Sequence, residues 1–125
     1  MGIQQFRINS GPIAADGTAT ATGRLIKGEI LSVEVNYPTN TCTVDLDSQE
    51  AITQKIVDLA ADNTDKVVYP RVALEDNTGT DLDLSDTEGG DTAVYGHFVV
   101  HGRLKLTIAS GTEDDEVVVF VNVQS

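Results

Sequence analysis

Apolar and polar residues alternate with a period of two along most of this chain. The alternation is clearest where Cys42, Val44 and Leu46 interleave with polar residues, and again at 104–108. This pattern is typical of a β-strand that turns one face toward a core. We therefore expect about eight strands, over residues 3–8, 18–22, 25–37, 42–47, 67–74, 93–101, 104–108 and 117–123.

The segment 25–37 has the strongest strand pattern, but the pattern is not uniform. Its apolar positions change phase between Ile30 and Val33, and Gly28 interrupts the run. An extra residue in a strand produces such a phase change, and glycine inside a strand often marks a bend. The sequence therefore predicts a bulge or a bend within this strand.

Residues 48–61 are compatible with two structures. Ile52, Ile56 and Leu59 have helical spacing, and Asp47 with Glu50 matches the pattern of a capping box, so a short helix near 48–61 is one interpretation. An edge strand over 56–59 is the other. The strands on both sides favour the edge strand.

Turn signals rich in Gly, Pro, Asn and Asp separate these segments at intervals of about 8–12 residues. Regular short strands of this kind predict an all-β fold, an antiparallel β-sandwich or jelly roll. No repeat and no linker-like composition divides the chain. We therefore expect one domain that spans residues 1–125.

The balance of charges limits the possible partners. The chain has 20 Asp and Glu against 8 Lys and Arg, a net charge of −12. Nucleic acids and anionic membranes select basic surfaces, so we expect neither as a partner. Two explanations of the acidic surface stay open, namely solubility in concentrated salt and complementarity to a basic protein partner.

The single cysteine and the apolar runs limit the compartment. Cys42 lies within a strand pattern, so we expect it to be a small buried hydrophobic residue. The first residues do not have the pattern of a signal peptide, and the longest apolar run, 117–121, is too short to span a membrane. These features predict a protein made and kept in the cytosol, or released by lysis.

The acidic loop 76–88 is the strongest candidate for a metal site. Asp81, Asp83 and Asp86 supply carboxylates of the kind that calcium prefers. The spacing does not match an EF-hand loop, and leucines alternate with the acids as they do in a small strand. A solvated loop is the favoured interpretation, and we expect no cofactor.

The residues give no indication of catalysis. His97 and His101 would lie about 13 Å apart along a strand, which is too far for both to bind one metal ion. No Ser/His/Asp arrangement and no phosphate-binding loop stand out, and the acids are too numerous to nominate a catalytic pair. The sequence therefore indicates a protein that is not an enzyme, with no catalytic residues.

A series of strand and turn segments extends over nearly the whole chain. The segments are 6–8, 11–13, 16–25, 30–37, 62–65, 69–71 and 102–109. Together they resemble small virion proteins of tailed phages and archaeal tailed viruses. The resemblance implies a capsid decoration or cementing protein, which binds the outer surface of an assembled shell and stabilises it.

The same resemblance implies the major capsid protein as partner, a homotrimer or dimer, and a place in the virion. A head–tail joining or tail component is an alternative role. A jelly-roll module that binds a receptor or carbohydrate is an alternative of another class.

Two segments are candidates for the interface with the shell. Decoration proteins often use a terminal arm to add a strand to the capsid protein, which implies an arm within residues 1–10 and contacts through Ile3, Phe6 and Ile8. The second candidate is the run Tyr69, Pro70 and Arg71, because Tyr and Arg are enriched at interfaces. Pairing of Arg71 with a local acid is the alternative.

Overall fold

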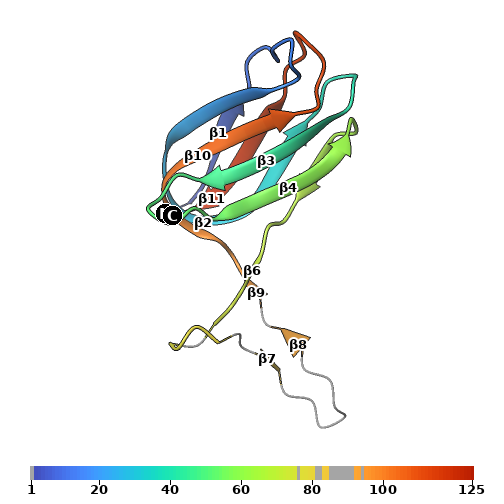
Figure 1. Ribbon diagram of the computed structural model, residues 1–125. Helices are drawn as coiled ribbons and strands as arrows, with labels where there is room; N and C mark the ends of the chain where they lie inside the picture. Colours follow the sequence, from blue (N-terminus) through green and yellow to red (C-terminus); the bar gives the residue numbers. More distant parts are fainter. Residues whose placement is uncertain (1, 76, 81–82, 85–91, 94) are drawn as a thin grey trace.

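The computed structural model describes residues 2–75, 77–80, 83–84, 92–93 and 95–125, with the side chains of 83–84 and 92–93 left aside. The described residues form a curled antiparallel sheet from which a hairpin projects, and they contain no helix (Figure 1). The strands are β1 (Ile3–Asn9), β2 (Ala19–Asn36), β3 (Cys42–Ser48), β4 (Lys55–Asp62), β5 (Lys66–Val68), β6 (Val72–Ala73), β7 (Asp83–Leu84), β8 (Thr92–Ala93), β9 (Tyr95–Gly96), β10 (Val99–Ala109) and β11 (Val118–Gln124).

The long strand β2 belongs to both layers of the fold. Its first part, 19–29, pairs with β10, and its last part, 29–36, pairs with β11. One layer therefore has the order β2-β10-β3-β4, and the other has the order β1-β11-β2-β5. This arrangement confirms the predicted all-β fold of the β-sandwich or jelly-roll type.

The bend and the bulge predicted in 25–37 are both present. Gly28 has a φ of 136°, and a Cβ at this position would lie 2.4 Å from the carbonyl oxygen of Gln124. Further along β2, the pairing with β11 skips Leu31. The skipped residue explains how Ile30 and Val33 are both buried in spite of their odd spacing.

The core lies between the two layers and consists of the inward-facing residues of the long strands. Cys42 is among them, and burial raises the pKa of its thiol, which confirms the predicted buried hydrophobic residue. The fully buried side chains of largest volume are Ile13, Ile26, Ile30, Val33, Val35, Val44, Leu46, Val100, Leu104, Leu106, Ile108 and Val117.

Residues 48–61 form a turn and the strand β4, so the helical alternative is wrong. Ile52, which the helix would have turned toward the core, is 82% exposed. Glu50 caps no helix: its carboxylate accepts hydrogen bonds from the backbone N–H of His101 at 2.8 Å and from the Gln54 side chain at 2.9 Å. The turn is therefore held by contact with β10.

Other boundaries also differ from the sequence prediction. The strands expected over 18–22 and 25–37 form the single strand β2. The break expected between 93–101 and 104–108 lies inside β10, where Gly102 packs against the Glu50 side chain. The predicted strand 67–74 is divided at Pro70 into β5 and β6, as the missing N–H of proline allows.

Residues 3–9 form an edge strand rather than a separate arm. β1 pairs with β11 along its whole length, with Ile3 opposite Gln124 and Asn9 opposite Val118. Ile8 is 4% exposed and belongs to the core. In this structure the expected arm is therefore part of the sandwich.

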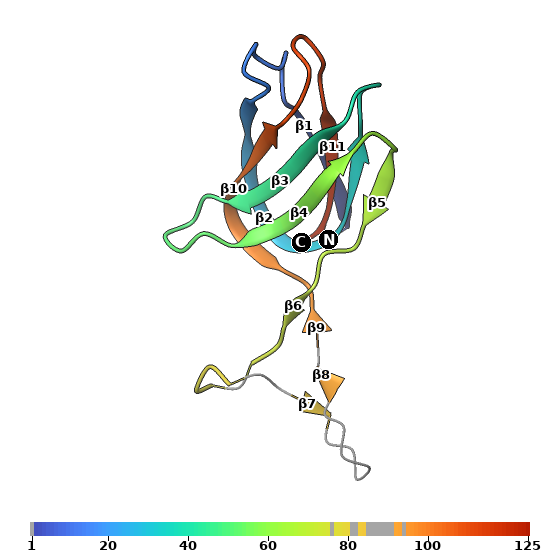
Figure 2. The ribbon, with the colours of Figure 1, turned by 45° about the vertical axis from the view of Figure 1, so that its right-hand side comes forward.

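Between β5 and β10 the chain leaves the sandwich as a hairpin. β6 pairs with β9 and β7 pairs with β8, and these short ladders lead away from the curled sheet (Figures 1 and 2). Both ends of the chain lie at the end of the sandwich from which the hairpin projects (Figure 2). Within the described ranges, no helix is long and apolar enough to cross a membrane.

Candidate functional site

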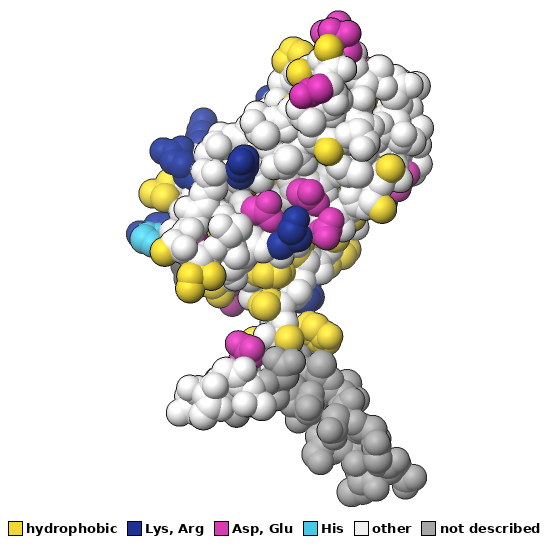
Figure 3. Space-filling view, viewed as in Figure 1, with side chains coloured by type: hydrophobic (Ala, Val, Ile, Leu, Met, Phe, Trp, Pro, Cys, Tyr) yellow, Lys and Arg dark blue, Asp and Glu magenta, His cyan; other side chains and the backbone are white. Residues whose placement is uncertain are grey.

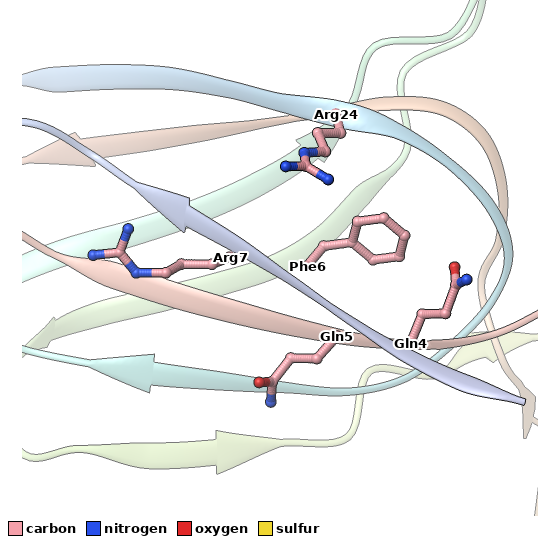
Figure 4. A pocket seen from close by; sticks show the side chains of 5 residues that line it. All are labelled: Gln4, Gln5, Phe6, Arg7 and Arg24. Atoms are coloured by element: carbon pink, nitrogen blue, oxygen red, sulfur yellow. The ribbon is translucent and has the colours of Figure 1, made fainter.

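A groove opens between β1 and the first part of β2, where the curled sheet does not close. Among the described strands, β1 pairs only with β11, and 19–28 of β2 pair only with β10, so each has an unpaired edge that faces the other. Near Gly23 the gap is closed, since a Cβ there would lie 3.0 Å from the Ile8 Cδ1 atom. Elsewhere it widens to a cavity of about 670 Å³ lined by Gln4, Gln5, Phe6, Arg7 and Arg24 (Figure 4).

Three arginines from three different strands meet at this groove. Arg7 and Arg24 line the cavity, and together with Arg103 they also line an adjoining hollow of about 260 Å³. The Arg103 guanidinium donates a hydrogen bond of 3.0 Å to the carbonyl oxygen of Gly23. Within the part of the chain that the structure describes, none of the three lies within 4.0 Å of a carboxylate.

The cations of this acidic chain are concentrated on one side of the sandwich. Arg7, Arg24, Lys27, Arg103 and Lys105 lie on β1, β2 and β10, and they are five of the 8 Lys and Arg residues. Figure 3 shows Lys and Arg side chains along the left edge of the sandwich, while a further one lies among the Asp and Glu side chains at the centre of this face. The groove is therefore a cationic site on a protein of strongly negative net charge.

Acidic residues are concentrated on the neighbouring strands. Asp45 and Asp47 of β3 each lie 3.7 Å from the ammonium group of Lys55, and Asp58 of β4 is paired opposite Asp45. Burial, and next the hydrogen bond with Asp58, raise the pKa of Asp45, while Lys55 lowers it. Asp45 and Asp47 therefore share one cation.

The predicted contacts at the N-terminus have three different environments. Ile3 is 67% exposed at the start of β1, and Phe6 is half-buried in the wall of the groove. Ile8 is a core residue and is not available to a partner in this structure.

The second predicted contact lies at the opposite edge of the same layer. Tyr69 is 64% exposed, whereas Pro70 is buried. The Arg71 guanidinium donates to the carbonyl oxygens of Pro70 at 2.7 Å and Leu31 at 3.4 Å, so among the described residues it bonds carbonyls rather than a local acid. The structure therefore does not bring the two predicted segments together.

Exposed apolar residues surround the base of the hairpin. Val67, Tyr69, Tyr95 and Val99 are each at least half exposed, and they come from the segments where the chain leaves and re-enters the sandwich. Figure 3 shows hydrophobic side chains around this end of the sandwich. We call these four residues the hairpin-base patch. Sequence alone did not reveal it, because its members are separated by the whole hairpin.

The predicted metal residues lie largely outside the described part of the chain. Asp81 and Asp86 fall outside it, and Asp83 is described only as backbone of β7. Among the residues with described side chains, no group of three or more His, Cys, Asp and Glu could hold a metal ion. His101 is exposed and His97 is half-buried.

No protein-family model and no curated protein sequence match this chain. Among solved structures it is similar to the N-terminal cellulose-binding domain of β-1,4-glucanase C from Cellulomonas fimi, with 9% identity and a TM-score of 0.34, over 94% of this chain and 85% of that one. It is also similar to a chain of infectious bursal disease virus strain Gx, with 12% identity and a TM-score of 0.35, over 99% of this chain and 38% of that one. Neither likeness bears on what this chain binds.

Proposed function

We propose that this chain is a non-enzymatic structural subunit of a virion, a decoration protein on the outer surface of the capsid. Its partner is the major capsid protein, and it acts as a homo-oligomer. The strand and turn pattern of the sequence supports this role, and so does a surface arranged for contact with a large partner.

The observation that carries the proposal is the hairpin-base patch beside a projecting hairpin. Exposed apolar residues that are grouped in space mark interaction surfaces, whereas scattered ones are ordinary. Two of the four residues are tyrosines, which are enriched in interfaces. The patch lies at the end of the sandwich from which the hairpin projects, and this end can pack on the shell (Figure 2).

The mechanism is preferential binding to the assembled state. A subunit that binds the shell but not its dissociated parts lowers the free energy of the shell, and so raises its resistance to disassembly. A subunit present at 100 times its dissociation constant contributes about 2.7 kcal/mol per site. Many such sites act on one particle.

The groove supports a second candidate function, the binding of carbohydrate. Its cavity is lined by two amides, two guanidinium groups and one aromatic ring, and such groups can bind hydroxyl groups and the faces of sugar rings. Saturable binding of the intact chain to a defined glycan on an array, lost in Arg24→Ala, would favour this function over decoration.

Cosedimentation with emptied, undecorated capsids tests the decoration role. We expect saturable binding of the intact chain and a higher melting temperature of the shell. The double variant Tyr69→Ser/Tyr95→Ser should lose at least tenfold in affinity. The matched control is Leu25→Ser, which removes an exposed large apolar residue on the outer face of β2. No binding by the unaltered chain, or equal losses in both variants, would contradict the proposal.

A further inference from the structure

We propose that the groove between β1 and β2 receives the acidic segment 81–91 of a second copy of this chain. The chain would then assemble by exchange of hairpins between copies. This inference concerns contacts between copies and does not rest on the role in the virion.

The shape of the groove suits an extended segment. Two strand edges face each other across it without pairing, and between them lies a cavity of about 670 Å³. An extended segment can add to a free strand edge through main-chain hydrogen bonds. The half-buried ring of Phe6, which packs against the core, supplies an apolar floor, and Gln4 supplies amide donors at one end (Figure 4).

The positive charge of the groove suits an acidic segment. Arg7 and Arg24 line the cavity, Arg103 lies at the adjoining hollow, and no ion pair joins any of them to a described carboxylate. A chain with 20 acids and 8 Lys and Arg has an excess of carboxylates with which to pair them. Guanidinium groups bind carboxylates through paired, charge-assisted hydrogen bonds, so these three favour an acidic occupant.

Residues 81–91 combine the acidic and apolar side chains that this groove would bind. They include five Asp and Glu and no Lys or Arg, and Asp81-Leu82-Asp83-Leu84 alternates acid with leucine. In an extended segment, alternate side chains point to opposite sides. Leucines could then contact the apolar floor while carboxylates contact the arginines.

The direction of the hairpin favours a second copy over the same chain. The described ladders β6–β9 and β7–β8 lead away from the sandwich in both views, so they do not turn back toward their own groove (Figures 1 and 2). Two copies can each supply what the other lacks, in a reciprocal pair or a closed ring. The net charge of −12 opposes association at low salt, and at about 0.15 M salt this long-range repulsion is screened beyond roughly 8 Å.

A charge-swap experiment tests the exchange. Sedimentation velocity at 0.15 M salt should show concentration-dependent association of the unaltered chain. The groove variant Arg7→Glu/Arg24→Glu and the hairpin variant Asp81→Lys/Asp83→Lys should each be monomeric. An equimolar mixture of the two variants should associate again, because each groove then meets side chains of opposite charge at positions 81 and 83. Lys27→Glu, which reverses a cation of β2 outside the groove lining, should associate as the unaltered chain does.

Thermal melts of each variant establish that it is folded before its mass is interpreted. A chain that is monomeric up to about 100 µM would overturn the proposal. Association of either variant alone at the unaltered affinity would overturn it as well, and so would two folded variants that fail to associate when mixed. The experiment contains no capsid, so its failure would leave the decoration role to its own test.

Discussion

At the scale of single residues, Gly28 marks the point where β2 passes from one layer to the other. Gly28→Ala would place a methyl group 2.4 Å from the Gln124 carbonyl oxygen, in a backbone conformation that L-residues rarely adopt. We expect the free energy of unfolding in urea to fall by more than about 2 kcal/mol. Gly79→Ala is the control, since its φ is also positive but no described atom lies within 4 Å of the added methyl group. Equal losses at the two positions would show that the contact with Gln124 is not the cause.

Tyr37 is a core residue whose hydroxyl group has no hydrogen-bond partner among the described residues. Burial, with smaller contributions from Asp62 and Cys42, raises the pKa of Tyr37 to about 12. A buried polar group without a partner costs free energy, so Tyr37→Phe should leave the stability unchanged or raise it by up to about 1 kcal/mol. Urea unfolding beside Tyr69→Phe, a change at an exposed tyrosine, measures this. A loss of more than about 1 kcal/mol would mean that the hydroxyl group is bonded after all.

Asp45 gives the stability a dependence on pH. Its folded pKa is raised chiefly by burial, so the folded state favours the protonated carboxyl group and the charged form destabilises the fold at neutral pH. This cost disappears as the pH falls through the folded pKa. We therefore expect Asp45→Asn to melt at a higher temperature than the unaltered chain at pH 7, with the difference shrinking in acid.

Lys55→Gln is the control for this prediction, because it should change the melting temperature in the opposite direction. It removes the cation shared by Asp45 and Asp47, so its melting temperature at pH 7 should fall. A lower melting temperature of Asp45→Asn at pH 7 would contradict the assignment.

At the scale of elements, β1 decides whether the N-terminal segment acts as an arm. Removal of residues 2–8 would expose the edge of β11 and take Ile8 out of the core. Truncation of a buried isoleucine alone costs about 2–5 kcal/mol, so the shortened chain should melt far below the full one or fail to fold. An unchanged melting temperature would show that this segment is separable from the sandwich.

Local alternation made much of the fold predictable from the sequence. The inward positions of 42–48 and the phase change in 25–37 follow directly from how the strands pair, and the structure confirms both predictions. Residues 49–54 were less predictable, because the contact of Glu50 with the backbone of His101 joins two segments far apart in the chain. β10 continues through Gly102 for the same reason. Its contacts there are with residues 48–50, which lie far away in the sequence, so the alternation along the chain does not show them.

The groove could not be predicted from the sequence at all. Arg7, Arg24 and Arg103 belong to three strands, and they meet only because the curled sheet brings β1 beside β2 and β10. Nothing in the spacing of these residues distinguishes them from other surface cations. The hairpin-base patch could not be predicted for the same reason. Val67 and Tyr69 precede the hairpin, whereas Tyr95 and Val99 follow it, and the two pairs come together only in the folded chain.

At the scale of the whole molecule, the net charge of −12 sets how stability responds to salt. Like charges repel within the folded chain, and added salt screens this repulsion. We expect the melting temperature to rise between about 0.01 M and 0.5 M sodium chloride. Equal stability at both ends of this range would count against adaptation to salt as the reason for the acidic surface, and would favour complementarity to a basic partner.

The decoration role is tested most directly by the position of the protein on the particle. Electron cryomicroscopy of whole virions, compared with particles that lack this chain, should show added density at regular positions over the outer surface of the shell. The sandwich should fit that density with the hairpin-base patch against the capsid protein. Density confined to a single vertex or to the tail would contradict decoration and would favour a joining or tail component.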